Sequence, residues 1–175
     1  MNARRPLTVV ALLALAAGLA GCGYHVGPLT HPQLRRLAVA PVRNETNDGR
    51  LAALAAEKLR NRLVQEGSVQ LVSTPQADAV LETTVKTARI YSRGTVEVNA
   101  GDDRQQAYRT TLYGVEVEVE YTLIRQGRAV LAPRTIMGTG EFSELPDLDT
   151  MRLQGYRQAL TAAADRVISD VTEAW

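Results

Sequence analysis

The alternation between residues 113 and 123 restricts the fold of this chain more than any other stretch. Apolar or aromatic side chains occupy every odd position from Tyr113 to Leu123, and Glu116, Glu118 and Glu120 lie between them. Successive side chains of a β-strand point to opposite faces, so this pattern predicts a strand over 109–125 with one packed and one solvated face. Other elements must therefore cover the apolar face.

Two segments have the periodicity of helices that could provide this cover. Apolar side chains recur at four-residue steps in 50–66, and Gly67 follows at the position where a left-handed cap is expected. A second apolar stripe, at steps of three and four, predicts a helix over about 150–173, capped by Asp147 or Asp149.

Four further segments are predicted as strands: 37–42, 69–72, 78–91 and 129–142. Segment 43–49 is polar and predicts a turn, segment 93–106 predicts a long mobile hairpin connection, and 125–128 predicts a tight turn. Pro41 is expected at a strand end or edge. In the last strand, Pro133 is expected to interrupt the pairing, and Gly138 and Gly140 to soften it.

The order of these elements is strand, helix, four strands, helix. It predicts an α/β fold of the α+β type, arranged as a two-layer sandwich. We expect a mostly antiparallel sheet of four to five strands with two helices on one face, and the glutamates on the other.

The N-terminal segment predicts secretion and lipidation. Arg4 and Arg5 precede an apolar run of 14 residues, too short for the about 20 residues that a membrane-spanning helix needs. Leu19-Ala20-Gly21-Cys22 then looks like a bacterial lipobox, in which the thiol accepts a diacylglycerol and cleavage occurs between Gly21 and Cys22. The alternatives are an ordinary signal peptide with a chance cysteine, or a buried free thiol. The position of the only cysteine favours the lipobox.

Lipidation predicts the organisation and location of the chain. We expect a removed signal peptide at 1–21, a lipidated tether at 22–36 and a single α/β domain at 37–175. A diacylglycerol and an N-acyl chain on Cys22 would anchor the protein, because two or more acyl chains hold a protein on a membrane. Gly23 stands where many inner-membrane lipoproteins of Gram-negative bacteria have aspartate, which predicts the periplasmic side of the outer membrane.

Composition and motifs give no support for catalysis. After loss of the signal, 18 basic and 19 acidic residues remain, and this balance does not favour nucleic acid as a partner. His25 and His31 both lie in the tether, without metal-ligand spacing to other residues. The alternating glutamates are about 6.6–6.8 Å apart, a separation used by inverting glycosidases. Such a face is more often solvated, so we expect no enzyme, no metal and no cofactor beyond the acyl chains.

Two short segments carry a family resemblance. Residues 22–27, Cys-Gly-Tyr-His-Val-Gly, and 37–46, Leu-Ala-Val-Ala-Pro-Val-Arg-Asn-Glu-Thr, together with the order of elements, resemble the lipopolysaccharide-assembly lipoprotein family LptE. The resemblance implies an outer-membrane lipoprotein that plugs the β-barrel LptD, binds lipopolysaccharide through basic residues and helps deliver it to the outer leaflet. No basic motif here matches the family's lipid-binding positions residue by residue.

Segment 37–46 and the helix after it are also similar to periplasmic lipoproteins that activate penicillin-binding proteins. An activator of a peptidoglycan synthase is therefore the alternative function.

Four arginines are the candidate lipopolysaccharide contacts: Arg89, Arg93, Arg104 and Arg109. They flank the connection predicted over 93–106, where two strands would bring them together, and guanidinium groups bind phosphate in a bidentate fork. The alternative is a solvated loop whose charge Asp102 and Asp103 balance.

Overall fold

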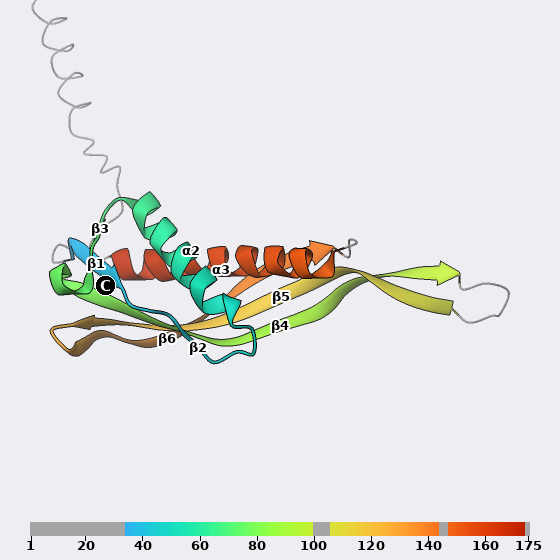
Figure 1. The fold of residues 1–175 in the computed structure, drawn as a ribbon, viewed down its shortest axis with the longest axis horizontal. Helices are drawn as coiled ribbons and strands as arrows, with labels where there is room; N and C mark the ends of the chain where they lie inside the picture. Colours follow the sequence, from blue (N-terminus) through green and yellow to red (C-terminus); the bar gives the residue numbers. More distant parts are fainter. Residues whose placement is uncertain (1–33, 100–105, 144–146, 174–175) are drawn as a thin grey trace, which may run out of the picture.

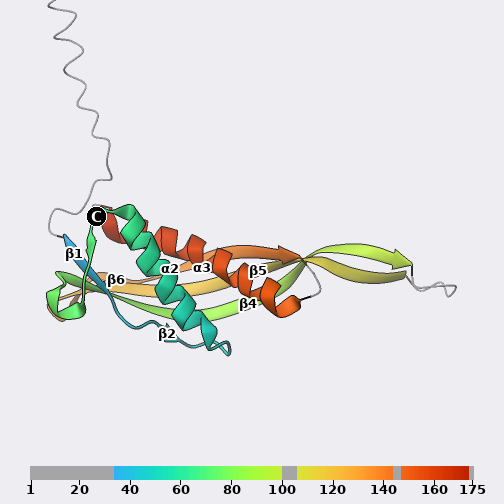
Figure 2. The same ribbon diagram turned by 45° about the horizontal axis from the view of Figure 1, so that its top comes forward.

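The fold is a six-stranded sheet with two helices on one of its faces (Figures 1 and 2). The computed structural model describes residues 34–99, 106–143 and 147–173. The helices are α2 (Arg50–Glu66) and α3 (Leu148–Thr172), and a short 3-10 helix spans Thr74–Gln76. The strands are β1 (Arg36–Val39), β2 (Arg43–Asn44), β3 (Gln70–Leu71), β4 (Ala79–Asn99), β5 (Gln106–Arg125) and β6 (Arg128–Ser143). The predicted α+β sandwich is confirmed.

The sheet is mixed, and it has one strand more than the largest number expected. Its order is β3-β1-β4-β5-β6, and β2 pairs with β4 beyond the end of β1. Strand β1 runs parallel to β3 and β4, and β2 runs parallel to β4. The β4–β5 and β5–β6 pairs are antiparallel. The parallel part arises because α2 carries the chain back between β1 and β3, as a crossover connection requires. Strand β2 lies in the segment predicted as a turn.

The β4–β5 hairpin is longer than predicted. Its strands continue to Asn99 and begin again at Gln106, so most of the expected connection over 93–106 is strand. Register shifts around Gly94 show how the pairing continues: bulges absorb extra residues while the two strands stay bonded. Strand β6 ends opposite Leu112, and beyond this point the hairpin is two-stranded and extends past the helices (Figure 1).

The alternation in β5 divides the sheet into two faces as predicted. Val115, Val117, Val119 and Leu123 are each at most 2% exposed and lie in the core beneath the helices. Full burial of one such side chain contributes about 1.5–3 kcal/mol. The packed face therefore accounts for most of the cohesion between the two layers.

The boundaries of α2 and the positions of two turns were also predicted correctly. Gly67 caps α2 with φ 68°, and Gln126 and Gly127 form the tight turn between β5 and β6 with φ of 50° and 74°. At the start of α3, the Asp147 side chain accepts a hydrogen bond from the main-chain N–H of Thr150 at 3.2 Å.

The prediction for β6 was wrong in two respects. The strand continues through Pro133, which an edge strand tolerates, and a register shift accompanies it. Gly138 and Gly140 do not soften the strand but allow α3 to lie against it. A Cβ at Gly138 would be 2.0 Å from the carbonyl oxygen of Ala159, and one at Gly140 would be 2.3 Å from that of Gly155.

Candidate interaction site

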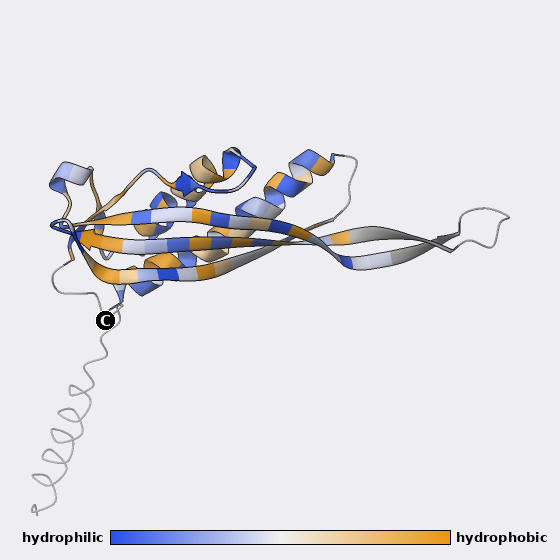
Figure 3. Cartoon of the chain, turned by 90° about the horizontal axis from the view of Figure 1, so that it is seen from below, coloured by the Kyte–Doolittle hydropathy of each residue, from blue (hydrophilic) through white to orange (hydrophobic). Residues whose placement is uncertain are grey.

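The sheet face away from the helices carries polar side chains. Figure 3 shows this face, with hydrophilic and hydrophobic residues interspersed along the strands. Glu116, Glu118 and Glu120 are half-buried there, and the Thr87 hydroxyl donates to Glu118 at 3.1 Å. A cleft between residues 45–49, β4 and α3 includes none of the three carboxylates. The arrangement therefore fits the solvated face favoured above over a pair of catalytic acids.

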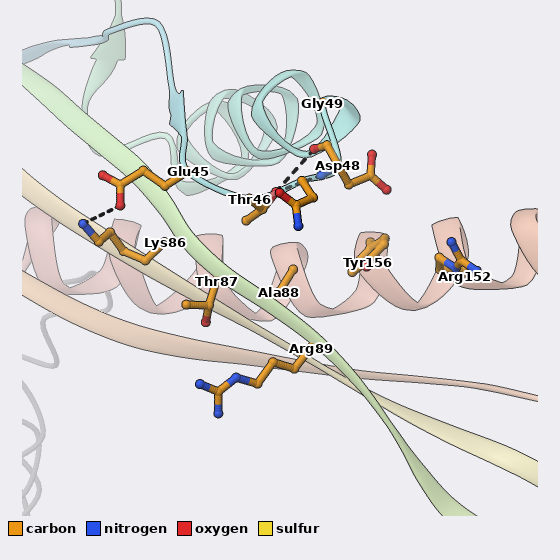
Figure 4. Close-up of a pocket in the computed structure, with 11 residues that line it drawn as sticks. Glu45, Thr46, Asp48, Gly49, Lys86, Thr87, Ala88, Arg89, Arg152 and Tyr156 are labelled. Carbon is orange, nitrogen blue, oxygen red and sulfur yellow. Dashed lines mark hydrogen bonds and ion pairs between the residues drawn. The ribbon is translucent and has the colours of Figure 1, made fainter.

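A cleft of about 540 Å³ lies between three segments that are far apart in the sequence (Figure 4). Residues 45–49 form one wall, residues 86–89 of β4 form the second, and Arg152 and Tyr156 of α3 form the third. The Lys86 ammonium pairs with Glu45 at 2.7 Å, and this hydrogen bond raises the pKa of Lys86.

The 44–50 loop is held by its own hydrogen bonds. The Asn44 side-chain oxygen accepts from the main-chain N–H and the hydroxyl of Thr46, and the Asn44 amide donates to the Asp48 carbonyl at 2.8 Å. Arg50 pairs with Asp48 at 2.7 Å, which lowers the pKa of Asp48. Burial raises the pKa of Tyr156, and the Asp48 carboxylate adds to this effect. Both acids of this wall are thus neutralised by neighbouring cations.

Two cations beside the cleft are left for a ligand. Arg89 is exposed and forms no ion pair with the described residues. Arg152 lies 3.7 Å from Asp149, whose side chain is 78% exposed and therefore holds the guanidinium weakly. Figure 4 shows Arg89 extending away from the 45–49 loop and Arg152 on α3, so the two cations lie on different sides of β4.

The register of the hairpin places three of the four predicted arginines. Arg89 lies opposite Glu116, and Arg93 forms an ion pair with Glu141 of β6. The main chain of Arg109 pairs with Val96, seven residues from Arg89, or about 23 Å at 3.3 Å per residue. The side chain of Arg109 and the whole of Arg104 lie outside the described residues. Arg89 and Arg109 therefore do not come together at one hairpin end as expected, because the strands continue past Tyr91, and the role of the four arginines in lipopolysaccharide binding stays a prediction.

Sequence reasoning missed the cleft and its residues Lys86 and Arg152. Each lies in a segment whose local pattern indicates only a strand or a helix. The cleft arises from the packing of α3 and the 45–49 loop beside β4, a long-range arrangement without a local signal.

Within the described ranges, no group of three or more His, Cys, Asp or Glu residues is placed to hold a metal ion. Over the same ranges, no helix has the length and apolar character needed to cross a membrane. Cys22 and Gly21, the predicted lipidation and cleavage residues, lie outside the described residues, as do His25 and His31.

Comparison with known proteins gives both a fold and a family. A Xanthomonas campestris protein of known crystal structure is similar with a TM-score of 0.53 and 14% identity, over 85% of this chain and 87% of that chain. The solution structure of a lipoprotein B from Nitrosomonas europaea is similar with a TM-score of 0.50 and 12% identity, over 87% and 90%. At such identities the likeness concerns the fold alone. No curated protein sequence matches.

The family comparison covers most of the sequence. The family described as LptE, lipopolysaccharide-assembly, matches residues 34–174, which include every helix and strand of the sheet sandwich. This chain therefore belongs to the LptE family of lipopolysaccharide-assembly proteins.

Proposed function

We propose that this chain is an outer-membrane lipoprotein of the lipopolysaccharide transport machinery, which binds lipopolysaccharide and both plugs and helps to assemble an LptD β-barrel. The observation that carries this proposal is the family match over residues 34–174. The family is one of non-enzymatic lipopolysaccharide-assembly lipoproteins, and the Leu19-Ala20-Gly21-Cys22 sequence supplies the expected anchor. The acyl chains on Cys22 would hold the domain at the periplasmic side of the outer membrane.

The polar sheet face supports a position inside a barrel. The interior of a large outer-membrane barrel is polar and hydrated. A plug must therefore present a surface that tolerates water and forms hydrogen bonds with the barrel wall. The face with Glu116, Glu118 and Glu120 meets this requirement, and the helices cover the apolar face within the chain itself.

The hairpin arginines support contact with lipopolysaccharide. Phosphates of lipid A and acids of the inner core are matched by guanidinium groups, which form paired hydrogen bonds to them. Arg89 is exposed and unpaired among the described residues, and Arg93 could exchange Glu141 for a phosphate. Arg89 and Arg93 both lie on β4, which suits a long ligand with several anionic groups better than a single phosphate, and Arg104 and Arg109 remain predicted contacts.

Binding of lipopolysaccharide can be tested with charge-neutral variants. We expect Arg89→Gln with Arg93→Gln to weaken lipopolysaccharide binding to the purified lipoprotein, measured by a shift in fluorescence of labelled lipopolysaccharide. Surface changes of this kind usually alter stability by less than about 0.5 kcal/mol. The control is Arg35→Gln with Arg128→Gln, which removes the same charge from exposed positions that are not among the four candidate arginines. Equal affinity of the two double variants would place the lipid site elsewhere.

The barrel partner can be tested by purification from detergent-solubilised outer membranes. We expect a tagged chain to co-purify with a β-barrel protein of the LptD type in equal amounts. We also expect depletion of the chain to leave that barrel misassembled and lipopolysaccharide in the periplasm. Co-purification with a peptidoglycan synthase, together with normal barrel levels after depletion, would instead support the cell-wall alternative.

A further inference from the structure

One edge of the sheet changes from covered to open along β4. The Ala40 N–H donates to the Leu81 carbonyl at 3.0 Å, and the Glu45 N–H donates to the Val85 carbonyl at 2.9 Å. Strands β1 and β2 therefore cover the edge of β4 up to Val85. The chain then turns away through residues 45–49, and β4 continues along the sheet without a neighbouring strand on this side among the described residues.

The register identifies which main-chain groups the open edge presents. Hydrogen-bonded and non-hydrogen-bonded pairs alternate between antiparallel strands, and residues of the second kind direct their N–H and C=O groups away from the partner strand. The Val85 carbonyl faces the edge, and the bulge between Val85 and Thr87 shifts the alternation by one residue. Ala88 and Ile90, opposite Val117 and Val115, therefore direct their main-chain groups to the edge.

The other long edge of the sheet is protected by the chain itself. On β6, the Glu141 N–H donates to the side-chain oxygen of Gln158 at 3.0 Å, and Arg166 donates to the Met137 carbonyl at 2.9 Å. Both partners belong to α3. Among the described residues, no corresponding group bonds to Ala88 or Ile90. Exposed edges are often covered by a helix or a loop, and between its bulges β4 has no such cover among the described residues.

The surroundings of the open edge indicate what would pair with it. Between the bulges that follow Val85 and Ser92, residues 87–92 form a regular stretch of about 20 Å, the length of an ordinary strand. Ile90 points to the helix side of the sheet, yet it is 37% exposed. Two cations line the cleft at this stretch. Arg89 has no ion pair with a described residue, and Arg152 is held only weakly by Asp149.

We propose that residues 87–92 of β4 are a docking site for an extended segment of a partner protein, which adds to the sheet as a strand where β2 leaves it. Main-chain bonds to Ala88 and Ile90 provide the pairing. An apolar side chain of the segment covers Ile90, and acidic side chains meet Arg89 and Arg152. This site shares Arg89 with the proposed lipopolysaccharide contacts, but the main-chain pairing of Ala88 and Ile90 does not depend on lipopolysaccharide.

The first experiment is photocrosslinking of the full chain in cells, with p-benzoylphenylalanine as the probe at position 90. The matched position is 137, which is also exposed but lies on the protected strand β6. We expect the adducts from position 90 to fall in one short segment of the other protein that position 137 does not reach.

The second experiment is amide hydrogen exchange of this chain in complex with the partner protein that co-purifies with it from membranes. We expect the amides of Ala88 and Ile90 to exchange about tenfold or more slowly in the complex than in the chain alone. The amide of Arg89, which bonds to β5 in either state, is the internal control. Ala88→Pro should reduce recovery of the complex about tenfold, whereas Thr139→Pro, at an edge-facing position of β6, should not.

Three results would overturn the proposal. The first is an adduct that consists of two copies of this chain, which would indicate self-association at the β4 edge. The second is crosslinking of positions 90 and 137 to the same segment of the other protein. The third is a complex in which the exchange of Ala88 and Ile90 is unchanged, and this test holds even if Ala88→Pro fails to fold.

Discussion

Substitution of Gly138 by alanine tests the packing of α3 against the sheet most directly. The added Cβ would lie 2.0 Å from the Ala159 carbonyl oxygen and 2.9 Å from the Ala163 Cβ. Favourable separations between non-bonded carbon atoms are about 3.5–4.0 Å, so the helix must move by more than about 1 Å. The obstacle is main chain and has no rotamer that would relieve the contact. Overpacking of this kind costs about 1–3 kcal/mol.

Gly94→Ala provides the matched control for this substitution. Its Cβ would meet only the Leu112 Cβ at 3.4 Å, an ordinary contact. Both variants gain about 0.4–1 kcal/mol from a less flexible unfolded chain, so the difference between them isolates the clash. We expect Gly138→Ala to be about 2 kcal/mol less stable than Gly94→Ala in urea unfolding followed by circular dichroism. In thermal unfolding, a difference of this size would lower the midpoint temperature of Gly138→Ala by roughly 4–8 °C, at about 2–4 °C per kcal/mol. Equal stability would refute the close approach of α3 to β6.

Three further predictions concern the anchor and two hydrogen-bonded side chains. Cys22→Ala should release the folded domain from the membrane fraction or stall its processing, whereas mass spectrometry of the unaltered protein should find acyl chains on Cys22. Burial and the hydrogen bond to Asp170 raise the pKa of Tyr121. The folding stability should therefore fall as pH rises above the ordinary tyrosine pKa of about 10. In thermal unfolding, Tyr121→Phe should lessen this fall. Hydrogen bonds from Thr150 lower the pKa of Asp147. The contribution of these bonds to folding stability is therefore complete above the ordinary aspartate pKa and is lost as pH falls through the lowered pKa. Asp147→Ala should reduce the thermal stability at pH 7 and make stability depend less on pH in the acid range.

The sequence was most informative where a local pattern determines the structure. The alternation around Val117 predicted one buried face, since the period of a strand places every second side chain on one side. The four-residue repeat of α2 and the glycine after it predicted both ends of that helix, because cap and core face lie within one segment.

Prediction failed where distant segments decide the outcome. Segment 93–106 was predicted as a loop, but pairing with β5 extends β4 through bulges. Gly138 suggested a weakened strand because the helix that lies on it begins ten residues later. The arginine cluster depended on the length of the hairpin, and the cleft depended on how α3 packs, so neither could be read from local spacing.

The position of β1 has a mechanical consequence for an anchored protein. The tether enters the domain through β1, which lies inside the sheet between β3 and β4. At its start, the Asp78 carboxylate accepts from the main-chain N–H of Arg36 at 2.9 Å and pairs with the Arg36 guanidinium at 2.8 Å. Tension on the anchor along the axis of β1 would load the hydrogen bonds to both neighbouring strands in shear, so that they must break together rather than one after another. The predicted anchor on Cys22 would thus hold the domain at a point where the sheet resists pulling.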